Sequence, residues 1–161
     1  MSFTRLRKFI MRILANILWH VPFLGFLSSF FTFLLGSLLV LTIVGAPIGL
    51  GLIQLSKFLL TPFSKSMISK NELNVDQNKL WKSFGIIVRI FYFPIGLFLA
   101  VITIVQIAGL FISIIGIPVA VVLAKSLSTY FNPVNKICVA KAVEDELAKR
   151  NAEKQVDAYL R

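Results

Sequence analysis

The sequence predicts an all-α, multi-pass helical membrane protein built from two tandem helical hairpins. Hydrophobic residues make up 57% of its 161 residues and charged residues only 15%, whereas a soluble domain has about 25% charged residues. Two stretches, residues 23–44 and 94–115, contain no charge, and each has the roughly 20 residues needed to cross the hydrocarbon core. A Gly-x-Pro motif ends each stretch, at Gly45–Pro47 and at Gly116–Pro118.

The first predicted element is a basic amphipathic helix over residues 3–20. Arg5, Lys8 and Arg12 recur at spacings of three and four, which places them on one helical face, opposite apolar side chains. Trp19 near the end of the segment is typical of the membrane–water boundary. His20 is the only histidine and has no carboxylate near it in the sequence, so we expect an interfacial side chain rather than a ligand or an acid–base group.

Residues 23–44 form the first predicted spanning helix, and one of its faces carries small side chains. These are Gly25, Ser29, Thr32 and Gly36, at spacings of four, three and four. Small residues on one face let helix backbones approach closely in lipid. We therefore expect this stripe to be a packing seam.

Gly45 and Pro47 then break the helix, because proline lacks an N–H and disfavours the helical region for the residue before it. The next arm runs from Pro47 to Thr61. Its length of about 22 Å is short of a core of about 30 Å. The arm either crosses a thinned bilayer or enters and leaves on the same side. Gln54, Lys57 and Thr61 form a polar stripe on it.

The second unit repeats the first. Residues 63–83 are predicted as a polar loop, followed by a basic, aromatic approach to the second span at residues 94–115. Gly116 and Pro118 break that span, and a short arm then reaches Asn132. We expect one membrane domain over residues 1–140, with repeat one at about 1–70 and repeat two at about 71–140, followed by a helical tail at 141–161.

The repeat has an offset of 71 residues, which separates Pro47 from Pro118 and Pro62 from Pro133. The small stripe recurs at Gly96, Ala100 and Thr103, and the polar stripe recurs at Lys125, Ser128 and Asn132. Shared breaks, small faces and polar faces are hard to obtain together by chance. The sequence therefore predicts an internal duplication.

Charge predicts the orientation. Lysine and arginine are abundant in the N-terminal segment and in residues 63–89, and Lys136 and Lys141 follow the last arm. Basic residues near the ends of spans mark the cytoplasmic side, so we expect both termini there, beside an anionic inner leaflet. Both hairpins then start inside and are related by an axis along the membrane normal, with their Gly-x-Pro turns directed to the far face.

The segment Ile112–Val119, with its Gly-x-Pro motif, and the later residues Pro133–Lys136 resemble the YccF-type family of small bacterial inner-membrane proteins. Residues 41–49 with Pro62–Lys65 look like the other half of that family. The exit motif of such proteins often has glycine where this chain has Ser64 and Asn135. The resemblance implies a multi-pass protein of the bacterial inner membrane, and it implies no particular activity.

Residue types exclude several function classes. All seven acidic residues lie outside the apolar stretches, and the chain shows no metal-ligand spacing and no phosphate-binding loop. We expect no enzyme, no cofactor, no metal and no nucleic-acid partner. Two functions remain: a self-associating scaffold or accessory subunit of a membrane assembly, or a subunit of an oligomeric channel or transporter. Because Lys125 lies deep in its arm without a carboxylate nearby in sequence, such a lumen would favour anions.

Overall fold

The computed structural model of the protein describes residues 3–21, 23–73 and 78–160. Its helices are α1 (Phe3–His20), α2 (Gly25–Leu41), α3 (Ala46–Leu60), α4 (Lys79–Ile112), α5 (Ile117–Phe131) and α6 (Lys141–Tyr159). Its strands are β1 (Lys65–Ser69) and β2 (Lys136–Ala140), and two short 3-10 turns are η1 (Lys70–Leu73) and η2 (Ile114–Gly116). The side chain of Arg5 and part of the predicted loop, residues 74–77, lie outside the described residues.

The fold is mostly helical, as predicted, but the sequence prediction missed a small sheet. β1 occupies part of the segment predicted as a polar loop, and it pairs in antiparallel fashion with β2. Met67 lies opposite Cys138 at the centre of the pairing. Each strand has only five residues, and each forms because a partner strand far along the chain supplies its hydrogen bonds. A local sequence pattern does not contain that information.

The two strands are related by a two-fold symmetry, because each contact from β1 to β2 has an equivalent contact from β2 to β1. One flanking hydrogen bond runs from the Lys70 amide to the Asn135 carbonyl (2.9 Å), and the other from the Lys141 amide to the Ser64 carbonyl (3.0 Å). The two donors are 71 residues apart, and so are the two acceptors. The bounds of α3 and α5, and those of β1 and β2, differ by the same number.

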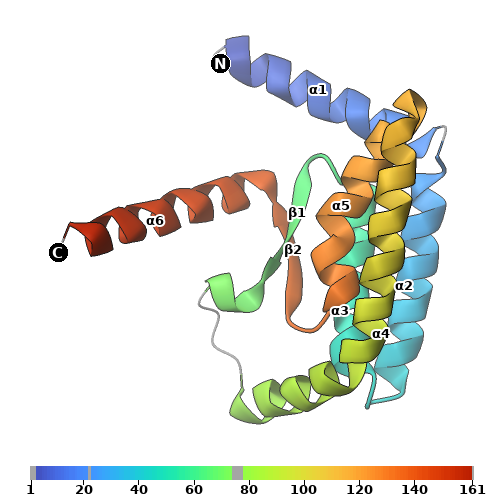
Figure 1. Ribbon diagram of the computed structural model, residues 1–161, viewed down its shortest axis with the longest axis vertical. Helices are drawn as coiled ribbons and strands as arrows, with labels where there is room; N and C mark the ends of the chain where they lie inside the picture. Colours follow the sequence, from blue (N-terminus) through green and yellow to red (C-terminus); the bar gives the residue numbers. More distant parts are fainter. Residues whose placement is uncertain (1–2, 22, 74–77, 161) are drawn as a thin grey trace.

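The described chain forms three layers (Figure 1). The sheet lies on one side, α3 and α5 form the middle layer, and α2 with the second part of α4, residues 94–112, forms the outer layer. The buried core contains Leu55, Phe58 and Leu59 of α3, Val122 of α5, Met67 of β1 and Trp19 of α1. The core therefore lies between the middle layer and the sheet, and the outer helices expose most of their apolar side chains.

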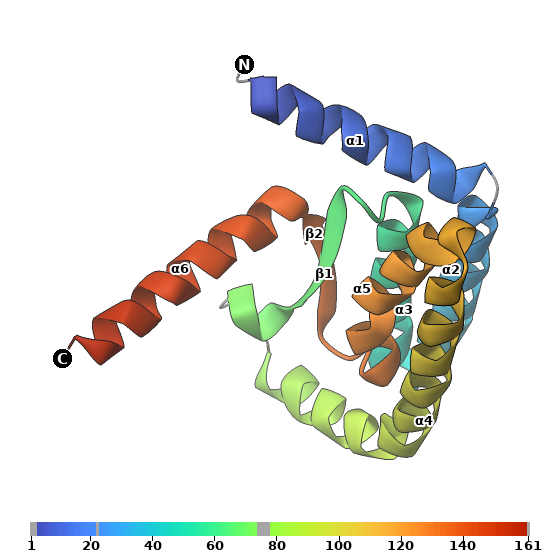
Figure 2. The ribbon, with the colours of Figure 1, turned by 45° about the horizontal axis from the view of Figure 1, so that its top comes forward.

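The two hairpins run in opposite directions. Val44 and Gly45 of the first Gly-x-Pro turn line an apolar hollow together with Phe84 of α4. At the same end of the bundle, the Tyr92 hydroxyl of α4 donates to the carbonyl of Tyr130, near the end of α5 (3.0 Å). The second turn, at the start of α5, lies at the other end (Figure 2). The prediction that both turns reach the same far face is wrong for a pair of upright hairpins, because the antiparallel strands force the hairpins before them to run oppositely.

α4 consists of two parts, residues 79–93 and residues 94–112. This helix is 34 residues long and contains Pro94, and it bends between a first part and a second part (Figure 1), as an internal proline causes. α1 and the first part of α4 extend from opposite ends of the bundle toward the side that holds the sheet and α6 (Figures 1 and 2).

Membrane-compatible helices are present by length and composition. Within the described residues, two segments, Lys79–Ile112 and Ile114–Phe131, are long and apolar enough to cross a membrane. A third candidate arises if α1 and α2, which meet at a 75° bend, count as one span.

Candidate functional site

The predicted polar stripes lie where α3 and α5 meet the sheet and the turns. The Gln54 side-chain oxygen accepts a hydrogen bond from the Cys138 amide of β2 (3.2 Å). The Lys125 ammonium donates to the Pro62 carbonyl (3.0 Å) and lies 5.4 Å from the centre of the Phe63 ring. Both stripe residues therefore connect one half of the chain to the other, and the charge of Lys125 is held by a carbonyl and an aromatic face.

Lys65 and Lys136, the first residues of β1 and β2, make equivalent contacts in the two halves. The Lys65 ammonium donates to the Lys57 carbonyl in the last turn of α3 (3.1 Å). The Lys136 ammonium donates to the Ser128 hydroxyl in the last turn of α5 (3.3 Å). Cations near the C-terminal end of a helix satisfy its unpaired carbonyls and favour its dipole. The side chain of Lys57 itself is exposed.

Thr61 and Asn132, which end the two stripes, follow the last residues of α3 and α5. The Asn132 side-chain oxygen accepts a hydrogen bond from the Val134 amide (3.3 Å). The Thr61 hydroxyl is buried and has no hydrogen-bond partner among the described residues. The side chains of the two stripes are thus used mainly in contacts within the chain, and the arms do not bring them together into one ring.

The small stripe also packs within the chain. A Cβ atom at Gly36 would lie 2.9 Å from the Gly49 carbonyl oxygen, so these glycines allow α2 to approach α3. The Ser29 hydroxyl donates to the Ser56 carbonyl across the same pair of helices (2.7 Å). In the second half, a Cβ at Gly96 would overlap the Phe131 carbonyl. Ala100 and Thr103 are buried, whereas Thr32 donates to Ser28 in its own helix.

The predicted helix breaks begin the short arms. Gly45 and Gly116 are the residues just before α3 and α5, and Pro47 and Pro118 lie in the first turns of those helices. Proline is well tolerated there because the amides of the first turn have no helical partner. These four residues therefore start helices as well as ending the preceding ones.

The sequence prediction missed a basic hollow of about 190 Å³ between α4 and the turn after α5. Lys82 and Arg89 line it from α4, on either side of Gly85. Its other lining residues are Ser69, Asn71, Ile86, Asn132, Val134 and Asn135. The spacing of Lys82, Gly85 and Arg89 by three and four residues places them on one helical face. This spacing is the feature of the sequence from which the hollow could have been predicted.

Charges of both signs act around this hollow, and at Lys136 the effect of Glu72 is larger than that of Arg89. Burial lowers the pKa of nearby Lys136, Glu72 opposes that change, and the charge of Arg89 adds to the lowering. Glu72 is engaged locally, since one of its carboxylate oxygens accepts a hydrogen bond from the Ser69 amide (3.3 Å). Lys82 and Arg89, which line the hollow, are therefore the groups that would hold an anion there.

α6 is attached to the sheet by charged groups. Glu144 accepts hydrogen bonds from the Ser66 hydroxyl (2.5 Å) and from the Lys141 ammonium. Burial alone would raise the pKa of Glu144, but the bonds from Lys141 and Ser66 outweigh it and hold this pKa below its usual value. The attachment is thus present at neutral pH and weakens as the pH falls through the pKa of Glu144.

Comparison with known proteins agrees with the membrane character of the fold. Residues 14–65 match the family model YccF, described as an inner membrane component domain. The match covers the last seven residues of α1, the first hairpin and the start of β1, and it stops before the second half of the chain. No curated protein and no solved structure matches the chain significantly. Through residues 14–65, the chain is thus similar to the YccF family of inner membrane component domains, and this similarity together with its apolar helices supports an integral protein of the inner membrane.

Proposed function

We propose that this protein is a one-sided, self-associating scaffold of the inner membrane. Its outer helix layer, α2 with the second part of α4, lies in the lipid of the cytoplasmic leaflet, and its sheet and α6 face the cytoplasm. The observation that carries this proposal is the position of the sheet. Gln54, near the middle of α3, bonds to Cys138 at the centre of the sheet, so the sheet lies at mid-length of the bundle.

The position of the sheet argues against upright helices. If α3 and α5 crossed the bilayer, the strands at their mid-length would lie in the centre of the hydrocarbon. Lys65 and Lys136 belong to these strands, and α6 starts directly after them with Lys141 and Glu144. Lipid-exposed strand edges do not occur at that depth, and charged side chains there are costly. A bundle that lies flat in the membrane plane avoids both costs.

The dimensions fit one leaflet. Packed helix layers are about 10 Å apart, and half of the hydrocarbon core is about 15 Å thick. The outer surface offers large, exposed apolar side chains to the lipid, among them Phe30 (58% exposed) in α2 and Phe98 (65% exposed) in α4. The short arms then need no thinned bilayer, and they correspond to the re-entrant alternative.

The flat arrangement also agrees with the charge pattern. α1, the first part of α4 and α6 all extend to the side of the sheet (Figure 2), so the basic segments meet the cytoplasm together, as the positive-inside rule requires. Both termini are then cytoplasmic. In the competing multi-pass arrangement, α1 and the first part of α4 extend from opposite ends of the bundle and would lie on opposite sides of the membrane.

An internal duplication accounts for the symmetry. The equal offset of α3 from α5 and of β1 from β2, together with the exchangeable bonds that flank the sheet, supports two copies of one hairpin-plus-strand unit. An axis through the Met67–Cys138 pair, perpendicular to the sheet, relates the copies. In the flat arrangement this axis is the membrane normal, as the charge pattern predicts.

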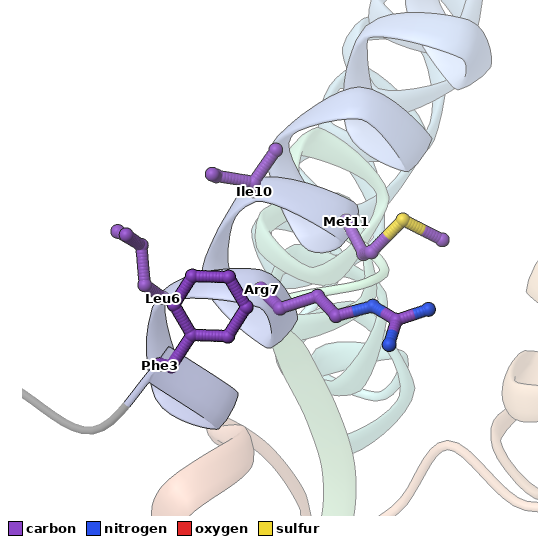
Figure 3. Close-up of a pocket in the computed structure, with 5 residues that line it drawn as sticks. All are labelled: Phe3, Leu6, Arg7, Ile10 and Met11. Carbon is purple, nitrogen blue, oxygen red and sulfur yellow. The ribbon is translucent and has the colours of Figure 1, made fainter.

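Self-association follows from the exposed apolar side chains of α1, which lies outside the lipid in this arrangement. α1 extends away from the bundle, and Phe3 (86% exposed) and Phe9 (55% exposed) are not covered by the rest of the described chain. A hollow on α1 is lined by residues of this helix alone, with Leu6 and Ile10 on one side and Arg7 and Met11 on the other (Figure 3). The apolar face of this amphipathic helix, exposed on the water side, needs a partner, and a second copy of this chain supplies the same surface.

The anion-channel alternative has a direct test in liposomes that contain the purified protein. We expect Lys125→Met to leave anion flux at the background level of protein-free liposomes, as in the wild type, because the Lys125 ammonium is held by Pro62 and Phe63 within the chain. Native mass spectrometry of the same samples should show an oligomer in both. A wild-type anion flux that Lys125→Met abolishes would favour the channel, and a monomer at all concentrations would refute the scaffold.

A further inference from the structure

We infer that the first part of α4 and the turn after α5 form a binding site for an anionic phospholipid. The site combines the basic hollow described above with an adjoining apolar one. The inference depends only on residence in the membrane, and the orientation proposed above enters only in the choice of the cytoplasmic leaflet.

The polar half of the site suits a phosphodiester. Lys82 and Arg89 supply two positive charges from one face of α4, and Asn71, Asn132 and Asn135 line the same hollow. A guanidinium can donate two parallel hydrogen bonds to phosphate oxygens. None of the lining residues in the described part of the chain is a carboxylate, so nothing among them repels an anion.

The apolar half of the site begins where the polar half ends. A neighbouring hollow of about 340 Å³ is lined by Ile86, Arg89, Ile90 and Phe93, and it shares Ile86 and Arg89 with the basic one. Along α4 the lining changes from Lys82 to Phe93 over a rise of about 16 Å. A free phosphate would occupy the basic hollow alone. A headgroup with its acyl chain matches both hollows in the order in which they occur.

At the equivalent place in the first half of the chain, a side chain of α1 bonds to the turn after α3. There the Asn16 side chain of α1 donates to the Ser64 hydroxyl (3.0 Å) and accepts from the Phe63 amide (3.1 Å). In the second half, the amide equivalent to that of Phe63 belongs to Val134, and it bonds to Asn132 within its own turn. The turn thus supplies the bond that Asn16 supplies in the first half.

The test measures lipid retention by the full-length protein in detergent, using native mass spectrometry with phosphatidylglycerol and, separately, phosphatidylcholine. We expect the wild type to retain phosphatidylglycerol preferentially. The double variant Lys82→Ala/Arg89→Ala should bind it about 30-fold more weakly, since each basic residue near a membrane surface contributes about a factor of five. Lys149→Ala/Lys154→Ala in α6 removes the same charge elsewhere and should leave the affinity unchanged.

Two further arms separate a lipid from a free anion. Ile90→Asn changes an exposed residue of the apolar hollow, and it should weaken phosphatidylglycerol binding while the basic hollow stays intact. Excess inorganic phosphate should not displace the lipid. Equal retention of phosphatidylglycerol by the wild type and by Lys82→Ala/Arg89→Ala would overturn the inference. Displacement by phosphate, equal binding of the two lipids, or an unchanged affinity of Ile90→Asn would overturn it too.

Discussion

Replacing Gly51 by alanine is expected to lower the free energy of unfolding by about 2 kcal/mol, because overpacking a closed contact typically costs about 1–3 kcal/mol. Gly51 lies in α3 where a Cβ atom would overlap the Pro133 carbonyl oxygen in the turn before β2. This contact joins the first hairpin to the strand of the second half, and the obstacle is backbone, which cannot rotate away. Thermal unfolding in detergent should show a midpoint lower by about 6 °C.

Gly109→Ala is the matched control for this substitution. Gly109 also lies within a helix, but a Cβ there would meet nothing within 4 Å. Alanine is a better helix former than glycine by up to about 1 kcal/mol, so this variant should be as stable as the wild type or more stable. If Gly51→Ala were as stable as Gly109→Ala, the close approach of α3 to the turn at Pro133 would be refuted.

Replacing Met67 by cysteine is expected to give nearly complete disulfide formation with Cys138 when the purified protein is oxidised. The two residues are direct partners in the ladder, and the Cys138 amide donates to Gln54 instead of across the strands. They therefore form a non-hydrogen-bonded pair, whose Cα atoms are about 4.5 Å apart, within the range that a disulfide spans. Intact mass should show the loss of two hydrogen atoms within one chain.

Ile68→Cys is the control for the crosslink. Ile68 is the neighbour of Met67 in β1 and pairs with Ile137, so its side chain leaves the opposite face of the sheet. It should not form an intrachain bond with Cys138. Crosslinking of Met67→Cys only between chains, or equal crosslinking of both variants, would contradict the pairing of β1 with β2 within the chain.

Much of the fold could be predicted from the sequence because it depends on local chemistry. Proline in a first helical turn starts α3 and α5 wherever the chain is placed, and the apolar runs make helices in lipid. The sheet could not be predicted, because β1 and β2 gain their hydrogen bonds only from each other, 71 residues apart. The direction of the hairpins depends on that sheet, so the sequence alone does not reveal that the two turns lie at opposite ends of the bundle.

One candidate site residue could be predicted from the sequence, and one candidate site could not. Lys125 was singled out as a charged residue in an apolar arm, and its partners, Pro62 and Phe63, belong to the other half of the chain. The basic hollow was missed because Lys82 and Arg89 read as ordinary basic residues flanking a span. Only the turn after α5, which brings Asn132 and Asn135 beside α4, makes these two cations line a common hollow.

The most direct test of the flat arrangement is labelling of single cysteines by a membrane-impermeant maleimide, in a Cys138→Ser background. The positions are Arg7 in α1, Lys70 in η1, Glu153 in α6, Val44 in the first turn and Ile115 in the second. We expect Arg7→Cys, Lys70→Cys and Glu153→Cys to react only when the cytoplasmic face is opened, and both turns to stay protected from either side. Labelling of a turn from the periplasm, or of Arg7→Cys and Lys70→Cys from opposite faces, would contradict the arrangement.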